Sequence, residues 1–297
     1  MKYLSLKELS NKWNLSERTI SNYCASGKIP GAVIINKKWN IPETASKPHR
    51  SNEKKNKNYL LEALRQEQKN RYEGGIYHLL QIDMAYNSNH IEGSKLTHDQ
   101  TRYIYETRTI GISNNQDPVN IDDIIETVNH FECIDRVIEN ANYQLTEGFI
   151  KQLHLILKTG TSDARKPYFV VGDYKKMPNM VGGRETASPR ETKNEMAKLM
   201  KEYNKKDSHS FEEIIEFHIK FERIHPFQDG NGRVGRLIIF KECLKNNIVP
   251  ILIKDEFKEY YYRGLKEWDN QKGYLIDTCL HGQDIVISYL DYFNIRH

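Results

Sequence analysis

A polar, basic stretch between residues 43 and 58 divides the chain into two parts that we expect to fold separately. Ala45 is the one small apolar side chain there that a core could use, so the stretch predicts a solvated linker. We assign residues 1–48 to a small N-terminal domain, residues 49–58 to a basic linker and residues 59–297 to a larger second domain.

The net charge is unevenly divided between these parts. Residues 1–58 hold 12 Lys and Arg against four Glu and no Asp, a net charge of +8, whereas residues 59–297 hold 32 basic and 36 acidic residues, a net charge of −4. The overall charge of +4 therefore combines a basic module with a weakly acidic one. With 38% hydrophobic residues, the composition is that of a folded chain and excludes a disordered one.

The sequence shows no signal for membrane insertion or export. Its apolar runs fall short of the roughly 18 residues that a transmembrane helix needs, and the N-terminus lacks the apolar core of a signal peptide. The cysteines form no Cys-x-x-Cys pair, which favours reduced, buried thiols over disulfides. We therefore expect a cytoplasmic protein without a membrane partner. The cysteines are Cys24, Cys133, Cys243 and Cys279.

The first 48 residues predict two short helices followed by a hairpin. Helical spacing of apolar residues indicates one helix that begins near Leu4 and ends at Trp13, and a second over residues 17–26. Two β-type runs, Val33–Ile35 and Trp39–Ile41, flank a polar turn. This order resembles the winged helix-turn-helix domains of the excisionase and MerR-like group.

That resemblance implies double-stranded DNA as a partner of the N-terminal domain. The second helix would face the major groove, and nearby lysines would contact phosphates. The alternative is a protein-docking or oligomerisation module, which would allow a homo-oligomer, but the charge of +8 favours DNA. The residues assigned to DNA contacts are Arg18, Thr19, Asn22, Lys28, Lys37 and Lys38.

The second domain is predicted to be mainly helical. Apolar residues recur at intervals of three and four over residues 121–128, 150–157 and 214–224. Between the last two, residues 166–190 hold Gly, Pro and β-branched residues, which predicts a hairpin or an irregular loop. The fold class is therefore mainly α with a small β-hairpin, joined to the small N-terminal domain.

The most informative segment is residues 225–236, which read His-Pro-Phe-Gln-Asp-Gly-Asn-Gly-Arg-Val-Gly-Arg. Its glycines fit a dinucleotide fingerprint, but that motif needs an apolar strand before the first glycine, and a polar segment stands here instead. Its centre also mimics an EF-hand loop, but positions 1 and 12 would be Phe227 and Ile238, so calcium is excluded. The P-loop pattern is absent.

What remains is a turn between two helices that is suited to bind an anion. Glycine-flanked amides around Asn231 and the start of the next helix direct positive charge to one point, where Arg233 and Arg236 can grip phosphate oxygens. Asp229 suits Mg²⁺ shared with a nucleotide, and His225 can accept a proton at neutral pH. The alternative is a structural helix cap, but the whole pattern favours transfer of a phosphorus-containing group.

The segment resembles the motif of the Fic family, His-x-Phe-x-Asp/Glu-Gly-Asn-Gly-Arg-x-x-Arg. Weaker likeness extends over residues 145–161 and 172–174. The resemblance implies a helical core that transfers AMP from ATP, with Mg²⁺ or Mn²⁺, to a Ser, Thr or Tyr hydroxyl of a protein target or of the enzyme itself. The matching residues are His225, Phe227, Asp229, Gly230, Asn231, Gly232, Arg233 and Arg236.

The resemblance also assigns a role to each polar residue of the motif. His225 would be the general base, and Asp229 would bind the metal ion. The turn over residues 230–232 would cradle the phosphates, with its asparagine toward the α-phosphate. Arg233 and Arg236 would hold the β- and γ-phosphates.

Residues 88–93, Ser-Asn-His-Ile-Glu-Gly, resemble the inhibitory helix of the family, Ser/Thr-x-x-x-Glu-Gly/Asn, which places that helix near residues 86–93. With Ser88 and Gly93 at its ends, the pattern implies that Glu92 pairs with Arg236 where the γ-phosphate would bind, so the enzyme is autoinhibited. Three alternatives stay open: a capped surface helix, a de-AMPylase or bifunctional enzyme that uses the same glutamate, and a DNA-binding regulator whose Fic domain senses ATP.

A flap over the active site is a further implication of the resemblance. Lys176, Met180 and Val181 lie where the family has a β-hairpin that clamps an extended target segment by strand addition. The alternative for these residues is an ordinary surface loop.

Three residues near the C-terminal end are assigned to the nucleotide. Tyr261 and Tyr262 would line the adenine pocket, although core aromatic residues have the same spacing. Asp269 stands where many relatives carry Asn near the ribose. We interpret His218 as a structural histidine.

Overall fold

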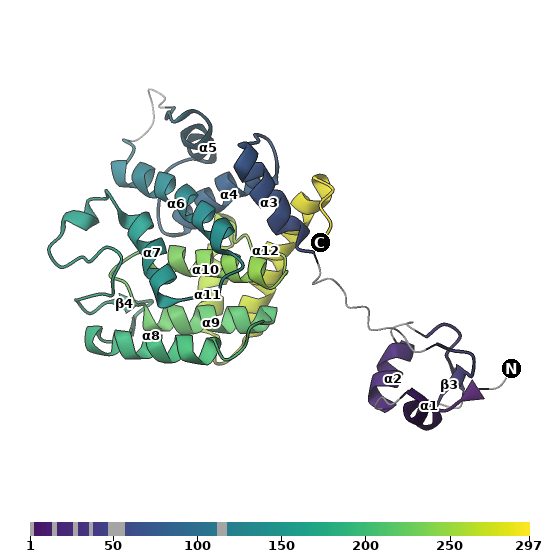
Figure 1. The fold of residues 1–297 in the computed structure, drawn as a ribbon. Helices are drawn as coiled ribbons and strands as arrows, with labels where there is room; N and C mark the ends of the chain where they lie inside the picture. The colour runs from purple at the N-terminus through teal and green to yellow at the C-terminus, as the bar shows by residue number, and fades with distance from the viewer. Residues whose placement is uncertain (1–2, 14–16, 26–28, 36–37, 47–56, 112–117) are drawn as a thin grey trace. The chain divides into compact units, whose positions relative to one another are not determined.

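The computed structural model describes residues 3–13, 17–25, 29–35, 38–46, 57–111 and 118–297. The chain divides into two compact units, Met1–Lys57 and Asn58–His297, and each is described by itself (Figure 1). Residues 49–56 of the predicted linker lie outside the described residues.

The N-terminal unit consists of two helices and a three-stranded antiparallel sheet of order β1-β3-β2. Leu4, which we expected in the first helix, lies in a strand and pairs with Ile41. The helix begins after Ser5 because the Ser5 hydroxyl accepts from the Glu8 backbone while the Glu8 carboxylate accepts from Ser5, a capping box. The elements are β1 (Tyr3–Leu4), α1 (Leu6–Trp13), α2 (Glu17–Ala25), β2 (Val33–Ile35) and β3 (Lys38–Pro42).

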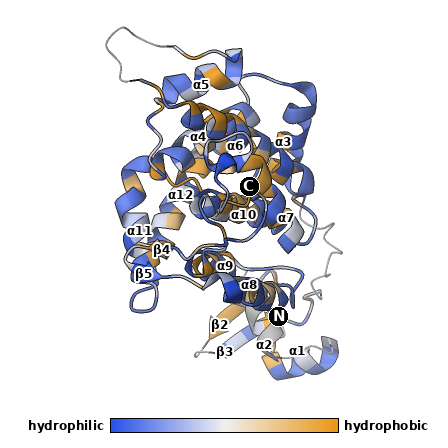
Figure 2. Cartoon of the chain, turned by 90° about the vertical axis from the view of Figure 1, so that its left-hand side faces the viewer, coloured by the Kyte–Doolittle hydropathy of each residue, from blue (hydrophilic) through white to orange (hydrophobic). Residues whose placement is uncertain are grey.

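The predicted hairpin of this unit is confirmed, because β2 and β3 pair with Val33 opposite Asn40. Strand β2 is hydrophobic but exposed along its length, and Figure 2 shows it in orange. The core of the unit is small and draws on both helices and on β3: Leu9, Trp13, Ile20, Cys24, Ile29 and Ile41.

The second unit is helical, with one small antiparallel hairpin, as the sequence predicts. Hydrophobic residues concentrate in its inner helices (Figure 2). Its helices are α3 (Tyr59–Asn70), α4 (Ile76–Ile91), α5 (His98–Thr107), α6 (Ile121–Asn140), α7 (Glu147–Lys158), α8 (Pro189–Tyr203), α9 (Phe211–Ile224), α10 (Asn231–Lys245), α11 (Lys258–Lys266) and α12 (Gly273–Tyr292). Two short 3₁₀ turns, η1 (Asp163–Arg165) and η2 (Asp255–Phe257), and strands β4 (Met180–Val181) and β5 (Arg184–Glu185) complete it.

Helix α10 is the central element of this unit. It contacts α4, α6, α7 and α9, and almost every side chain along it is buried. Its two buried charges near the C-terminal end compensate each other, since Lys241 Nζ lies 2.9 Å from Glu242 Oε1 and also donates to the Tyr143 carbonyl. Because α10 begins at Asn231, the C-terminal half of the motif is mostly buried in the unit.

The four cysteines are buried and none is bonded to another. This agrees with the prediction of reduced core thiols. Within the described part of the chain, no helix has both the length and the apolar character needed to cross a membrane.

The close contact of α11 with α12 at Gly264 gives a test of the packing. A Cβ on Gly264 would lie 2.7 Å from the Leu275 Cα, whereas the nearest atom to a Cβ on Gly273 would be the Gln271 Nε2 at 3.7 Å. We expect Gly264→Ala to lower the free energy of unfolding by about 1–3 kcal/mol through overpacking. Gly273→Ala, the matched control, should change it by less than about 0.5 kcal/mol or raise it.

Urea unfolding followed by circular dichroism measures both effects. Equal losses in the two variants would contradict the close helix contact.

Candidate active site

The motif forms the turn between α9 and α10. His225 ends α9 in the left-handed conformation with φ 50°, and Gly230 precedes α10 with φ 79°. Glycine adopts that conformation freely, but histidine does so at a cost, so the fold holds His225 in a strained position.

His225 has the tautomer that a general base requires. Its Nδ1 lies 3.3 Å from the Glu222 carbonyl oxygen, which can only accept, so Nδ1 carries the proton and Nε2 is left with its lone pair. Burial lowers the pKa of His225 to about 4, so the ring is neutral at pH 7. Burial and the Glu92 charge raise the pKa of the neighbouring Glu222 carboxyl to about 8.

Asn231 shapes the turn with its side chain. Its Oδ1 accepts from the Phe227 N–H at 2.8 Å, and its Nδ2 donates to the Phe227 carbonyl at 2.9 Å. Phe227 is fully buried and stacks on the His154 ring at 4.0 Å. Both polar ends of the Asn231 amide therefore fix the loop, whereas the resemblance directs it toward a phosphate.

Arg233 and Arg236 have separate sets of partners, although we expected both guanidinium groups to serve one anion. Arg233 donates to Glu126 of α6 and, at 3.1 Å, to Asp229. Arg236 turns toward the end of α4 and pairs with Glu92 at 2.6 Å. Sequence spacing predicted that the two side chains share a helix, but not what each of them meets.

Asp229 is half exposed beside a buried charge network. Burial alone would raise the pKa of its carboxyl, but Arg233 and Lys158 outweigh that effect and hold the pKa well below its usual range. Asp229 is thus a carboxylate at neutral pH, and oxygen is the ligand that Mg²⁺ prefers, so this residue fits a divalent cation.

Lys158 is a residue of this site that the sequence analysis missed. Its ammonium contacts Glu126, Asp163 and Asp229. The available signal was a lysine next to Leu157, at the end of a helix whose apolar face is buried.

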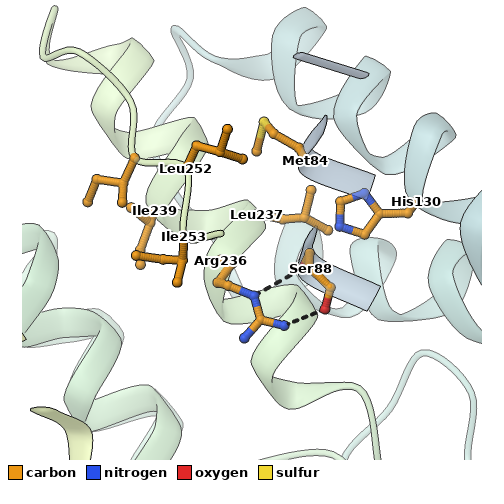
Figure 3. Close-up of a pocket in the computed structure, with 9 residues that line it drawn as sticks. Met84, Ser88, His130, Arg236, Leu237, Ile239, Leu252 and Ile253 are labelled. Carbon is orange, nitrogen blue, oxygen red and sulfur yellow. Dashed lines mark hydrogen bonds between the residues drawn. The ribbon is translucent and has the colours of Figure 1, made fainter. Parts of the chain in front are cut away.

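Three hydrogen bonds hold the Arg236 side chain. Nε donates to the Ser88 hydroxyl at 3.0 Å, and Nη2 donates to the Ser88 carbonyl at 2.9 Å (Figure 3). Nη2 also donates to Glu92 at 2.6 Å. The Ser88 carbonyl belongs to the last turn of α4, where helix carbonyls lack intrahelical partners. Arg236 therefore caps α4 while it pairs with Glu92.

The end of α4 is a Schellman motif, and this motif places Glu92. Gly93 has φ +102°, its N–H donates to His90, and the Ser94 N–H donates to Asn89 at 3.1 Å. The Glu92 carboxylate lies against the turn over residues 230–232, since a Cβ built on Gly232 would collide with it.

A small cavity of about 20 Å³ lies beside Arg236, as Figure 3 shows. It is lined mainly by apolar side chains from α4, α10 and residues 251–253, together with His130. Burial lowers the pKa of His130 to about 3, so this histidine adds no charge next to the arginine.

A larger cavity of about 1060 Å³ opens in front of the motif. Glu92, His225, Gly232 and Arg236 all line it, and so do the hairpin residues described below. Its volume is that of a site for a nucleotide-sized ligand.

The residues assigned to the nucleotide line this cavity but differ in exposure and in their hydrogen-bond partners. Tyr261 is 1% exposed, and its hydroxyl lies 2.6 Å from His218 Nε2. Tyr262 is 40% exposed and donates to the Ile91 carbonyl. Asp269 lines the cavity but forms a bidentate pair with Arg223. Only Tyr262 of the two tyrosines therefore offers an accessible ring.

The hairpin β4–β5 reaches the same cavity. Met180 and Val181 line it, whereas Lys176 is exposed and precedes the strands. Buried Lys175, which the sequence analysis also missed, anchors the hairpin by donating to Asn179 and Thr186, each at 2.6 Å. Burial lowers the pKa of Lys175 to about 8.

The residues assigned to DNA are only partly described. Lys38 is exposed at the start of β3. The side chains of Arg18, Thr19 and Asn22 in α2 are not described, and neither are Lys28 and Lys37, which lie outside the described residues.

Comparison with known proteins identifies a domain within the second unit. Residues 144–242 match the model of the Fic/DOC family. A protein adenylyltransferase Fic of Drosophila grimshawi is 28% identical over 216 residues, which are 69% of this chain and 39% of that protein. One of Aedes aegypti is 27% identical over 184 residues, which are 61% of this chain and 36% of that protein. The chain therefore contains a Fic/DOC domain and spans less than half the length of these relatives.

Solved structures show the same fold. A Fic-domain signalling protein of Bacteroides thetaiotaomicron matches with a TM-score of 0.61 at 24% identity, covering 78% of this chain and 94% of that one. A Fic family protein of Desulfovibrio desulfuricans matches with a TM-score of 0.57 at 21% identity, covering 81% and 76%. The mainly helical fold class is confirmed.

The pKa of His225 can be measured directly. Since burial lowers it to about 4, we expect its ring proton resonance to titrate well below the value near 6.5 of an unfolded histidine. The native state then binds this proton less tightly than the unfolded state, so His225 lowers the free energy of unfolding as the pH falls from about 6.5 toward 4.

The measurement is an NMR titration of the native protein, with the urea-unfolded chain as the control. A native midpoint near 6.5 would contradict the buried, neutral ring.

Proposed function

We propose that the second unit is a protein adenylyltransferase that moves AMP from ATP to a hydroxyl of a protein, with His225 as the general base. One observation carries the proposal: His225, Gly232 of the turn over residues 230–232 and Arg236 line one nucleotide-sized cavity. The relatives named as adenylyltransferases add support at the level of the family.

The proposed reaction is an in-line displacement. The target hydroxyl oxygen bonds to the α-phosphorus, its proton moves to His225 Nε2, and the bond to the bridging oxygen breaks as pyrophosphate leaves. Asp229 would hold a Mg²⁺ or Mn²⁺ ion, which neutralises phosphate charge when bound. The amides at the start of α10 and the Arg236 guanidinium would bind the phosphate oxygens.

The hairpin supports a protein rather than a small molecule as acceptor. Met180 and Val181 are exposed strand residues that line the same cavity as His225. An extended segment of a target that pairs with β4 would bring its Ser, Thr or Tyr hydroxyl toward the histidine.

The ion pair between Glu92 and Arg236 supports autoinhibition. The Glu92 carboxylate lies where a Cβ on Gly232 would collide with it, so it covers the start of α10 and neutralises Arg236. A nucleotide phosphate that uses the same guanidinium has to displace a charge-assisted hydrogen bond of 2.6 Å.

The position of Glu92 also supports the reverse reaction as a second candidate. Its carboxylate lines the same cavity as His225, where it could orient a water for removal of AMP from a modified protein. Assaying both directions distinguishes the two.

Removing the Glu92 carboxylate tests the proposal. We expect Glu92→Gly to raise self-labelling from labelled ATP and Mg²⁺ by about tenfold or more, which corresponds to about 1.4 kcal/mol of relieved competition at Arg236. Adding His225→Ala to that variant should abolish the label, because the hydroxyl then loses its base.

Glu259→Gly is the matched control, because Glu259 lines the same cavity and, within the described residues, forms no ion pair with Arg236. Its labelling should equal that of the unmodified protein. A Glu92→Gly protein that stays unlabelled and removes no AMP from a modified target would contradict both enzymatic proposals.

For the N-terminal unit we propose binding of double-stranded DNA, supported by the net charge of +8 over residues 1–58 and by the order of helices and hairpin. Affinity for a labelled duplex, measured by fluorescence anisotropy on the full chain, should fall with rising salt. Lys38→Ala should lower the salt slope by about one. Lys7→Ala, which removes another exposed lysine of the same unit, is the control for Lys38→Ala. An affinity for DNA that is independent of salt would contradict the proposal.

A further inference from the structure

Lys158 places a buried ammonium where three carboxylates converge. Its side chain is 2% exposed, and Nζ lies 2.5 Å from Glu126 Oε1 and 2.7 Å from both Asp163 Oδ2 and Asp229 Oδ2. The carboxylates come from three separate segments, namely α6, η1 and the motif turn. Lys158 is the last residue of α7, where the helix dipole also favours a cation.

The ammonium has no donor left for a ligand. A lysine carries three N–H bonds and no acceptor, and here three carboxylates take all of them. Lys158 therefore cannot also bind a phosphate oxygen in this arrangement, which distinguishes it from the phosphate-binding lysines of many nucleotide sites.

The Asp229 carboxylate is held by hydrogen bonds. Oδ2 accepts from both Lys158 and Arg233, and the Gly230 backbone N–H also donates to the Asp229 carboxylate. The Asp229 side chain is 50% exposed, so a metal ion can reach its carboxylate from the solvent side. Lys158 and Arg233 thus fix the orientation of the Asp229 carboxylate through its Oδ2 atom.

The carboxylate oxygens around Lys158 lie at the spacing of metal ligands. One oxygen each of Glu126, Asp163 and Asp229 lie within 4.8 Å of one another. A divalent cation bound by them would need the position that the ammonium occupies. The formal charges of the three carboxylates, Lys158 and Arg233 sum to −1. Without Lys158 the sum is −2.

We propose that Lys158 is a positioning residue that stands in for a resident divalent cation in this cluster, orients Asp229, and keeps metal out of the nucleotide-free site. A divalent cation then binds at Asp229 only when nucleotide phosphates supply further ligands, a step that rests on the proposed function. In the nucleotide-free site, the Lys158 ammonium thereby supplies the positive charge that a bound metal ion would otherwise supply. Because the ammonium is part of the chain, a chelator cannot remove it.

Mn²⁺ titrations of the nucleotide-free full chain, read by electron paramagnetic resonance, test the proposal without any enzymatic reaction. We expect the unmodified protein to bind no Mn²⁺ below about 1 mM. Lys158→Met should create a site that binds at least about tenfold more tightly, because three converging carboxylates lose their counter-ion. Lys158→Arg keeps the charge and should resemble the unmodified protein.

Lys166→Met is the matched control. Lys166 donates to the other oxygen of Asp163 at 2.5 Å but is exposed, so its loss removes a cation from the same carboxylate outside the cluster. It should change Mn²⁺ affinity less than about twofold. Adding Glu126→Gln to Lys158→Met should remove the gained site.

Two results would overturn the proposal. One is a folded Lys158→Met protein, checked by circular dichroism, that gains no Mn²⁺ site. The other needs no variant at Lys158: submillimolar Mn²⁺ binding by the unmodified, nucleotide-free protein that Asp229→Asn abolishes. Neither depends on AMP transfer, so failure of the proposed function would leave the nucleotide-free titration fully interpretable.

Discussion

The burial of α10 is the constraint on which the rest of the second unit depends. A helix that is surrounded by neighbours but begins with a polar, charged motif must have each of those groups compensated by a partner. The partners come from distant parts of the chain: α4 supplies Ser88, the residue after α4 is Glu92, α6 supplies Glu126, and α7 supplies Lys158. The site is therefore the place where the packing of four helices and their charge balance are satisfied together.

Periodicity and turn chemistry were enough to predict the class of fold. Apolar residues at helical spacing gave the helices of the second unit, and the polar turn after Val33–Ile35 gave the N-terminal hairpin. The error at Leu4 has a local cause, because the Ser5–Glu8 capping box starts the helix two residues later and frees Leu4 to pair with Ile41. The apolar character of a residue next to a helix does not indicate whether that residue joins the helix or a neighbouring strand.

The site was predictable only as far as its residues lie within one short motif. Spacing brought His225, Asp229 and the arginines to one turn, but it could not show that Arg233 and Arg236 face different carboxylates. Lys158 and Glu126 stand 32 positions apart in the sequence and meet only because α6 packs on α7. Such long-range pairs are set by tertiary packing, to which a single sequence gives no local signal.

The two hydrogen bonds between Arg236 and Ser88 have a consequence for the entropy of ligand binding. Ser88 accepts two of the three hydrogen bonds that Arg236 donates to described residues, one of them at its backbone carbonyl, and neither requires Glu92. An anion that replaces the Glu92 carboxylate thus meets an arginine already confined to one rotamer. Free arginine side chains carry about 2 kcal/mol of rotamer entropy. The end of α4 has already removed much of that freedom during folding, so little of it remains to be lost when the anion binds.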